Sequence, residues 1–205
     1  MVEGVRILVI KTAIATLLLL GHLALAQTET YLSANGTNPE TTRGESRLLH
    51  YAPENFPVEV YIPPAAWLDA ERQARTTVRR AFEAWADAAP ELVSFTFLEE
   101  PKGGALVVDW QPLEGLAGSY RYSFNVEADG RYDYRATSII LDPATEQGAL
   151  YRFAVLQVGH ALGLFGRSPF EGDALSAVPS GEVTARDVAT LRALYALPSG
   201  TVLRE

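Results

Sequence analysis

The stretch from Leu156 to Gly166 contains the residue types and spacings that bear most directly on chemistry. Its one histidine, His160, stands one helical turn after Leu156, and Gln157 follows Leu156 directly. A catalytic zinc ion needs about three protein ligands and an open position for a water molecule, whose pKa it lowers to roughly 7. Two histidines one turn apart on a helix, with a glutamate beside the first and a third histidine after a glycine turn, would meet that need. The sequence keeps His160 and Gly163 of such an arrangement.

Three replacements remove the rest of that chemistry. Leu156, at the first ligand position, offers no lone pair, and Gln157, at the general-base position, has a neutral amide that cannot take a proton from a zinc-bound water. Gly166 stands at the third ligand position; with one more residue in the turn, that position falls to Arg167, whose guanidinium cannot ligate a cation. We therefore interpret Leu156, His160 and Gly166 as vestigial ligand positions, and we expect neither a catalytic zinc nor another cofactor.

The composition points the same way. The 205-residue chain has three histidines and no cysteine, so further histidine ligands could come only from His22 and His50, which lie far from His160 in the sequence. One neutral imidazole holds zinc poorly, and we expect His160 to be hydrogen-bonded within the fold. The alternative is a working zinc site with substitute carboxylates, in which Glu171 or Asp173 joins His160.

Residues 1–26 have the pattern of a secretory signal peptide. Two basic residues precede an apolar run from Thr12 to Ala26, which ends in the small-residue sequence Ala24-Leu25-Ala26. The run is shorter than the roughly 20 residues of a membrane-spanning helix; an uncleaved anchor is the alternative. We expect the mature chain to begin at Gln27, to be secreted or periplasmic, and to have no membrane contact after cleavage.

Charge and cysteine usage narrow the class of protein further. The net charge of −8 at pH 7 disfavours nucleic-acid binding. Without cysteine no disulfide can form, and an exported protein without disulfides favours a bacterial source. The polar stretch 27–46 has few large apolar residues and predicts a disordered linker, either a spacer or a remnant propeptide. A single domain at 47–199 and a short tail at 200–205 follow it.

The periodicity beyond residue 57 predicts an α+β domain. Val58 to Ile62 alternates as a half-buried strand, and Asp69 can cap a helix that extends to about Ala88. The dipeptide Asp129-Gly130 is typical of a hairpin turn. The further predicted elements are strands at 93–98, 105–110, 119–127 and 132–141, an apolar helix at 146–164, and a last helix that Thr184 and Asp187 open as a capping box.

Three stretches resemble the metzincin metallopeptidases, the matrixins in particular, within about residues 48–198. Residues 158–164 resemble the second half of the matrixin zinc helix, residues 168–173 the approach to the methionine-containing turn, and residues 183–195 the C-terminal helix. Leu175 takes the place of that methionine. The resemblance implies a zincin-like fold: a mixed, twisted sheet of about five strands with a packed helix, a buried motif helix and a C-terminal helix.

In that family a substrate lies along an edge strand beside the motif helix. The resemblance therefore implies that residues 119–127 could pair with an extended peptide by strand addition. Tyr120, Tyr122 and Phe124 alternate along this stretch and form either one face of the peptide-binding strand or ordinary packing. We interpret the chain as a secreted pseudopeptidase with a peptide-binding or protein-binding, regulatory role. An active zinc metalloendopeptidase and a structural extracellular spacer are the alternatives. Structural calcium is common in the family, but no ligands for it can be assigned.

Overall fold

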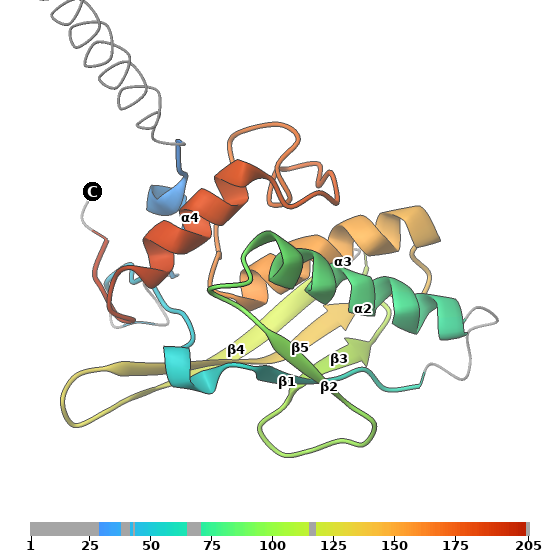
Figure 1. Ribbon diagram of the computed structural model, residues 1–205, viewed down its shortest axis with the longest axis horizontal. Coiled ribbons are helices and arrows are strands. Elements are labelled where there is room, and N and C mark those ends of the chain that lie inside the picture. The colour runs from blue at the N-terminus through green and yellow to red at the C-terminus, as the bar shows by residue number, and fades with distance from the viewer. Residues whose placement is uncertain (1–28, 38–41, 43, 65–70, 115–117, 204–205) are drawn as a thin grey trace, which may run out of the picture.

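The computed structural model describes residues 29–37, 42, 44–64, 71–114 and 118–203. The predicted signal peptide and the predicted helix cap Asp69 lie outside these described residues. Within them, no helix is long and apolar enough to cross a membrane. The chain forms one mixed β-sheet with helices on one of its faces (Figure 1). This arrangement confirms the predicted α+β class.

The sheet contains β1 (Val58–Tyr61), β2 (Phe95–Leu98), β3 (Leu106–Trp110), β4 (Gly118–Val126) and β5 (Tyr132–Leu141). Their order is β2-β1-β3-β5-β4. β1 pairs in parallel with β2 and β3, and β3 pairs in parallel with β5. β4 is antiparallel to β5 and lies at one edge of the sheet. All five strands begin and end close to their predicted bounds.

Two local signals in the sequence are confirmed. At the hairpin between β4 and β5, Gly130 has a φ of 84°, a left-handed conformation that glycine adopts without steric strain. At the start of α4 (Ala185–Tyr195), the Thr184 hydroxyl accepts from the Asp187 N–H at 3.2 Å, and the Asp187 carboxylate accepts from the Thr184 N–H at 2.9 Å. This reciprocal pair is the predicted capping box, which satisfies backbone donors that the helix itself leaves free.

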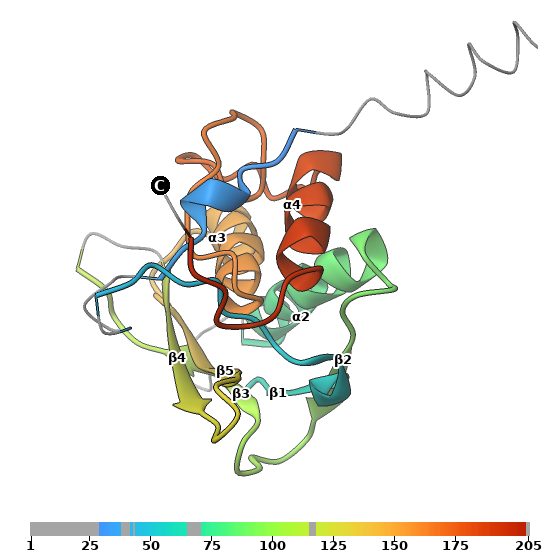
Figure 2. The ribbon, with the colours of Figure 1, turned by 90° about the vertical axis from the view of Figure 1, so that its left-hand side faces the viewer.

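Helices α2 (Glu71–Ala88) and α3 (Gln147–Ala161) lie side by side over the same face of the sheet (Figures 1 and 2). The apolar positions of α2 recur at helical spacing, and Val78, Phe82 and Trp85 are completely buried. The Trp85 indole N–H donates to the Val155 carbonyl on α3 at 2.9 Å. This bond ties the two helices together in the core, where an indole donor needs a partner.

The first described residues correct one prediction. The sequence predicts a disordered linker at 27–46, but residues 29–37 pack on the domain and include the short 3-10 helix η1 (Leu32–Ala34). Tyr31 is buried, and its hydroxyl donates to Asp187 Oδ1 at 2.5 Å. Asn35 is also buried, and its amide donates to the Tyr31 carbonyl at 2.8 Å. The prediction is wrong for these residues because their polar side chains find partners that local composition does not reveal.

The predicted C-terminal tail is also part of the domain. Arg47 and Val202 form an antiparallel β-bridge. The Gly200 N–H donates to the Leu48 carbonyl at 2.7 Å. The described residues after 199 therefore pair with the segment that precedes β1 and belong to the folded domain.

Candidate functional site

Helix α3 carries the first two predicted ligand positions, Leu156 and His160. Glu146 caps the helix by accepting from the Gly148 N–H at 3.4 Å. The helix ends at Ala161, three residues before the predicted end, because Gly163 adopts a left-handed φ of 102°. Leu156 is completely buried in the core. An apolar side chain thus fills the position from which a first ligand would reach a metal.

His160 is held within the fold by a backbone carbonyl. Its Nδ1 lies 2.6 Å from the Leu164 carbonyl oxygen. A carbonyl can only accept, so Nδ1 carries the proton in the neutral ring. The ring stacks on Tyr120 with 4.8 Å between centroids. Burial lowers the pKa of His160 to about 4, the Leu164 carbonyl opposes that shift, and the Arg167 charge adds to it. His160 is therefore neutral at neutral pH.

Gln157, at the general-base position, faces the start of β4. A Cβ built on Gly118 would lie 3.0 Å from Gln157 Cγ and 3.1 Å from its Nε2. The side chain is only 4% exposed, and its Oε1 has no hydrogen-bond partner among the described residues. A buried acceptor without a donor is costly, by about 1–3 kcal/mol. This neutral amide accepts and donates hydrogen bonds but has no basicity to offer.

The third ligand position lies beneath the N-terminal segment. The Gly166 N–H donates to Asn35 Oδ1 at 3.0 Å. A Cβ on Gly166 would lie 1.8 Å from the Ala34 carbonyl oxygen, so the segment leaves no room for a side chain here. In the alternative alignment the position falls to Arg167, whose Nη1 donates to the Ser176 carbonyl at 3.3 Å. The contribution of Asn35 could not be predicted, because it lies 131 residues from Gly166.

Leu175, in the place expected for the methionine turn, lies directly under α3. It is completely buried, and its carbonyl accepts from the Ser168 N–H at 2.9 Å. A Cβ on Gly159 would lie 2.7 Å from Leu175 Cδ1 and 2.8 Å from Trp85 Cζ2. The glycine therefore lets the helix approach Leu175 closely, and this leucine forms an apolar surface against Gly159.

The two substitute carboxylates are placed very differently. Asp173 is buried and accepts from Ser168 Oγ at 2.6 Å, from Thr184 Oγ1 at 2.9 Å and from Arg186 Nη1 at 3.2 Å. Its oxygens are thus occupied by neighbouring donors. Glu171 is exposed. In the part of the chain that the structure describes, no group of three histidine, cysteine, aspartate or glutamate side chains converges on one point.

β4 joins the predicted aromatic residues to the end of α3. Tyr120, Tyr122 and Phe124 are half-buried, whereas the residues between them are exposed, so the three rings share one face. Phe165, just beyond α3, stacks on Tyr122 with 4.9 Å between centroids and on Tyr120 with 6.0 Å. The rings therefore serve packing, and the strand is also an edge whose outer side pairs with no described strand. Packing is thus observed for these rings, and the peptide-binding strand stays a prediction.

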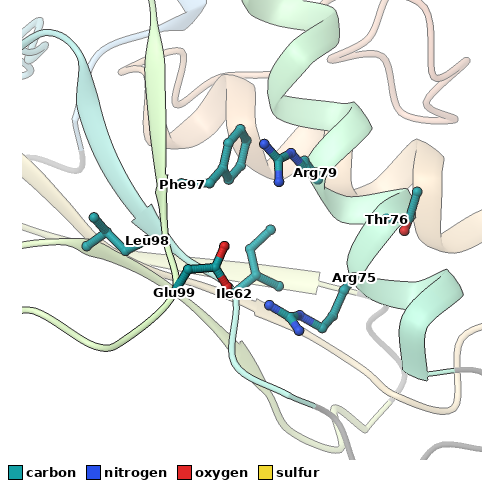
Figure 3. Close-up of a pocket in the computed structure, with 7 residues that line it drawn as sticks. All are labelled: Ile62, Arg75, Thr76, Arg79, Phe97, Leu98 and Glu99. Atoms are coloured by element: carbon teal, nitrogen blue, oxygen red, sulfur yellow. The ribbon is translucent and has the colours of Figure 1, made fainter.

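A separate hollow lies near β2, at the opposite edge of the sheet (Figure 3). It measures about 340 Å³ and is open to solvent. Arg75 and Arg79 reach into it from α2, while Phe97 and Glu99 line its other side (Figure 3). The Arg79 guanidinium carbon lies 4.3 Å from the centroid of the Phe97 ring. None of the site residues predicted from the sequence borders this hollow.

Comparison with known proteins gives no further guide. No family model matches the chain, and no curated protein is significantly similar to it. Function must therefore be argued from the geometry around α3 and β4.

Proposed function

We propose that this chain is a secreted, matrixin-like pseudopeptidase that binds extended peptides along β4 without cleaving them. One observation carries the proposal: Leu156 fills the position one turn before His160, while no described strand pairs with the outer edge of the neighbouring strand β4. The chain order also supports it, since a buried helix stands between a strand hairpin and a capped last helix. The matrixin resemblance and the export of the chain are parts of this proposal.

The residues around α3 argue against hydrolysis by a zinc-bound water. Leu156 has no lone pair, and Gln157 has no basic group to take a proton from water. His160 is neutral and buried, but it would lack further ligands among the described residues, because the candidate carboxylate Asp173 is bonded to Ser168, Thr184 and Arg186. A zinc site that needs about three ligands is thus left with one.

The same region favours peptide binding. An edge strand presents unpaired N–H and C=O groups, to which an extended peptide can add as a further strand. β4 has nine residues, Gly118–Val126, so it offers a long template. Its half-buried rings, Tyr120 and Tyr122 above all, provide apolar surface beside that template. The proposed partner is therefore an extended peptide or a flexible segment of a protein.

Hydrogen exchange with a defined set of peptides tests this proposal. The probes are terminally capped peptides of alternating valine and threonine, in which one position at a time is varied. We expect peptides that bind to slow amide exchange in 118–126 and to remain uncut by mass spectrometry. Every second amide of a peptide can be N-methylated in two ways, at the odd or at the even positions. Only one of the two should abolish binding, because a strand pairs through every second amide on each of its edges. Protection confined to the hollow of Figure 3, or cleavage of the peptides, would contradict the proposal.

A further inference from the structure

Arg167 follows Phe165, whose ring packs on Tyr120 and Tyr122 of β4, and it has spare hydrogen-bonding capacity. Of its five N–H donors, Nη1 donates to the Ser176 carbonyl at 3.3 Å. The other guanidinium nitrogens have no hydrogen bond among the described residues, and the residue is exposed to solvent. Arg167 can therefore donate hydrogen bonds to a bound ligand while it keeps its bond to the Ser176 carbonyl.

Ring contacts bring the chain just before Arg167 next to Tyr120. Tyr120 stacks on His160 at 4.8 Å and on Phe165, two residues before Arg167, at 6.0 Å. The positive charge of Arg167 lowers the pKa of His160 and partly offsets the rise that burial causes in the pKa of Tyr120. The cation thus lies close to the beginning of the edge strand.

No carboxylate within the described ranges neutralises Arg167. Asp173 forms its ion pair with Arg186 at 3.2 Å, and the ion pairs of the described residues leave Arg167 out. Partial burial lowers the pKa of Arg167, as expected for a cation that loses water without gaining an anion. The net charge of the chain is −8, yet this arginine has no carboxylate partner among the described residues and lies near an edge that no described strand pairs with.

We propose that Arg167 selects peptides with an acidic side chain, which it binds when the peptide pairs with the first residues of β4. This inference rests on the proposed function, because it names the class of peptide that the same strand receives. A guanidinium binds a carboxylate through two parallel hydrogen bonds, which gives both charge and geometric selection. The Gln157 side chain lies next to Gly118, and its buried Oε1 is a second polar atom at this end of the strand that has no partner among the described residues.

The test compares glutamate and glutamine in the valine-threonine peptides, placed at each position in turn. We expect one position at which glutamate binds about tenfold more tightly than glutamine. Arg167→Gln should remove this preference while leaving the affinity for the glutamine peptide nearly unchanged. Arg121→Gln is the matched control, because Arg121 is exposed on the other face of β4 and should keep the preference. Fluorescence anisotropy supplies the affinities, and circular dichroism checks the fold.

The outcomes separate the inference from the function on which it rests. If peptides protect β4 but glutamate gives no advantage at any position, the role of Arg167 is wrong and the binding strand remains. If Arg121→Gln abolishes the preference as fully as Arg167→Gln, the selection is diffuse electrostatics, and the inference again fails. If no peptide of the set protects β4, the proposed function fails, and the inference with it. If Arg167→Gln misfolds, the wild type is tested at increasing salt concentration. A preference for glutamate that salt does not weaken would contradict an ion pair with Arg167.

Discussion

Two buried regions of this molecule differ in their content of charged and hydrogen-bonded side chains. On α3, Leu156 is buried in apolar surroundings, and the two buried polar side chains of this helix, Gln157 and His160, are neutral. The His160 ring is bonded to the Leu164 carbonyl just beyond the helix. Below it, Asp173 and Asp187 form a dense polar cluster at the start of α4. Asp187 accepts from the Tyr31 hydroxyl, from the Ala174 N–H and from Thr184.

In this molecule, the residues that connect distant segments of the fold are separate from the residues of the candidate site. The aspartate cluster connects the N-terminal segment, the loop after α3 and the last helix, and therefore determines the fold. The surroundings of α3 contribute mainly close packing, through Leu156 on the helix, Leu175 in the loop after it and Trp85 on α2. Replacing residues of the α3 face is therefore expected to leave the hydrogen bonds of the aspartate cluster in place.

Removing Asp187 is expected to have the largest effect. In Asp187→Ala the Tyr31 hydroxyl and the N–H groups of Ala174 and Thr184 lose a fully buried acceptor. We expect a loss of about 3–5 kcal/mol in the free energy of unfolding, measured by urea denaturation. Glu171→Ala is the control: this carboxylate is exposed in the preceding loop and should change stability by less than about 0.5 kcal/mol. If both variants lowered the free energy of unfolding equally, Asp187 would contribute no more to stability than an exposed carboxylate, which contradicts the prediction.

The second prediction concerns the α3 face and the dependence of stability on the protonation of His160. Its pKa is 6.5 when unperturbed and about 4 in the fold, so between these values the unfolded chain binds a proton that the folded chain does not. Stability is therefore retained above about pH 6.5 and lost as the pH falls towards about 4. As the pH falls from about 7.5 to about 4.5, we expect the free energy of unfolding of His160→Phe to decrease by about 2–3 kcal/mol less than that of the wild type. Parallel pH curves in urea unfolding would show that His160 is not buried in its neutral form.

A smaller effect is expected from filling the close approach under α3. In Gly159→Ala the new methyl would meet Leu175 and Trp85 at less than 3 Å, and such overpacking costs about 1–3 kcal/mol. Gly148→Ala, in the first turn of the same helix, meets its nearest atom at 3.4 Å and should be neutral or stabilising by up to about 1 kcal/mol. Thermal unfolding of both variants provides the comparison. Similar melting temperatures for the two would mean that α3 does not rest tightly on Leu175.

The elements that local signals specify were predictable from the sequence. The turn at Asp129-Gly130, the capping box of Thr184 with Asp187, and the buried stripe of α2 each depend on residues within a few positions of one another. Leu156 could be placed in the core for the same reason, since its helix is apolar almost all round. These features need no knowledge of the rest of the chain.

The features that depend on distant contacts were not predictable. Tyr31 bonds to Asp187 across 156 residues, and Asn35 bonds to Gly166 across 131. Neither leaves a periodic pattern, so the polar N-terminal stretch has the composition of a linker although it is packed. The isolation of Arg167 from carboxylates also follows from the fold alone, because Asp173 lies near in the sequence but turns to Arg186.

Zinc titration of the purified protein tests the central claim most directly, namely that the α3 face is a packed surface and not a metal centre. After treatment with a chelator, the protein is titrated with zinc in a calorimeter. We predict no saturable binding, because Leu156 offers no ligand, His160 stands alone, and Asp173 is occupied by its own donors. A saturable site near one equivalent that is lost in His160→Phe would contradict the account.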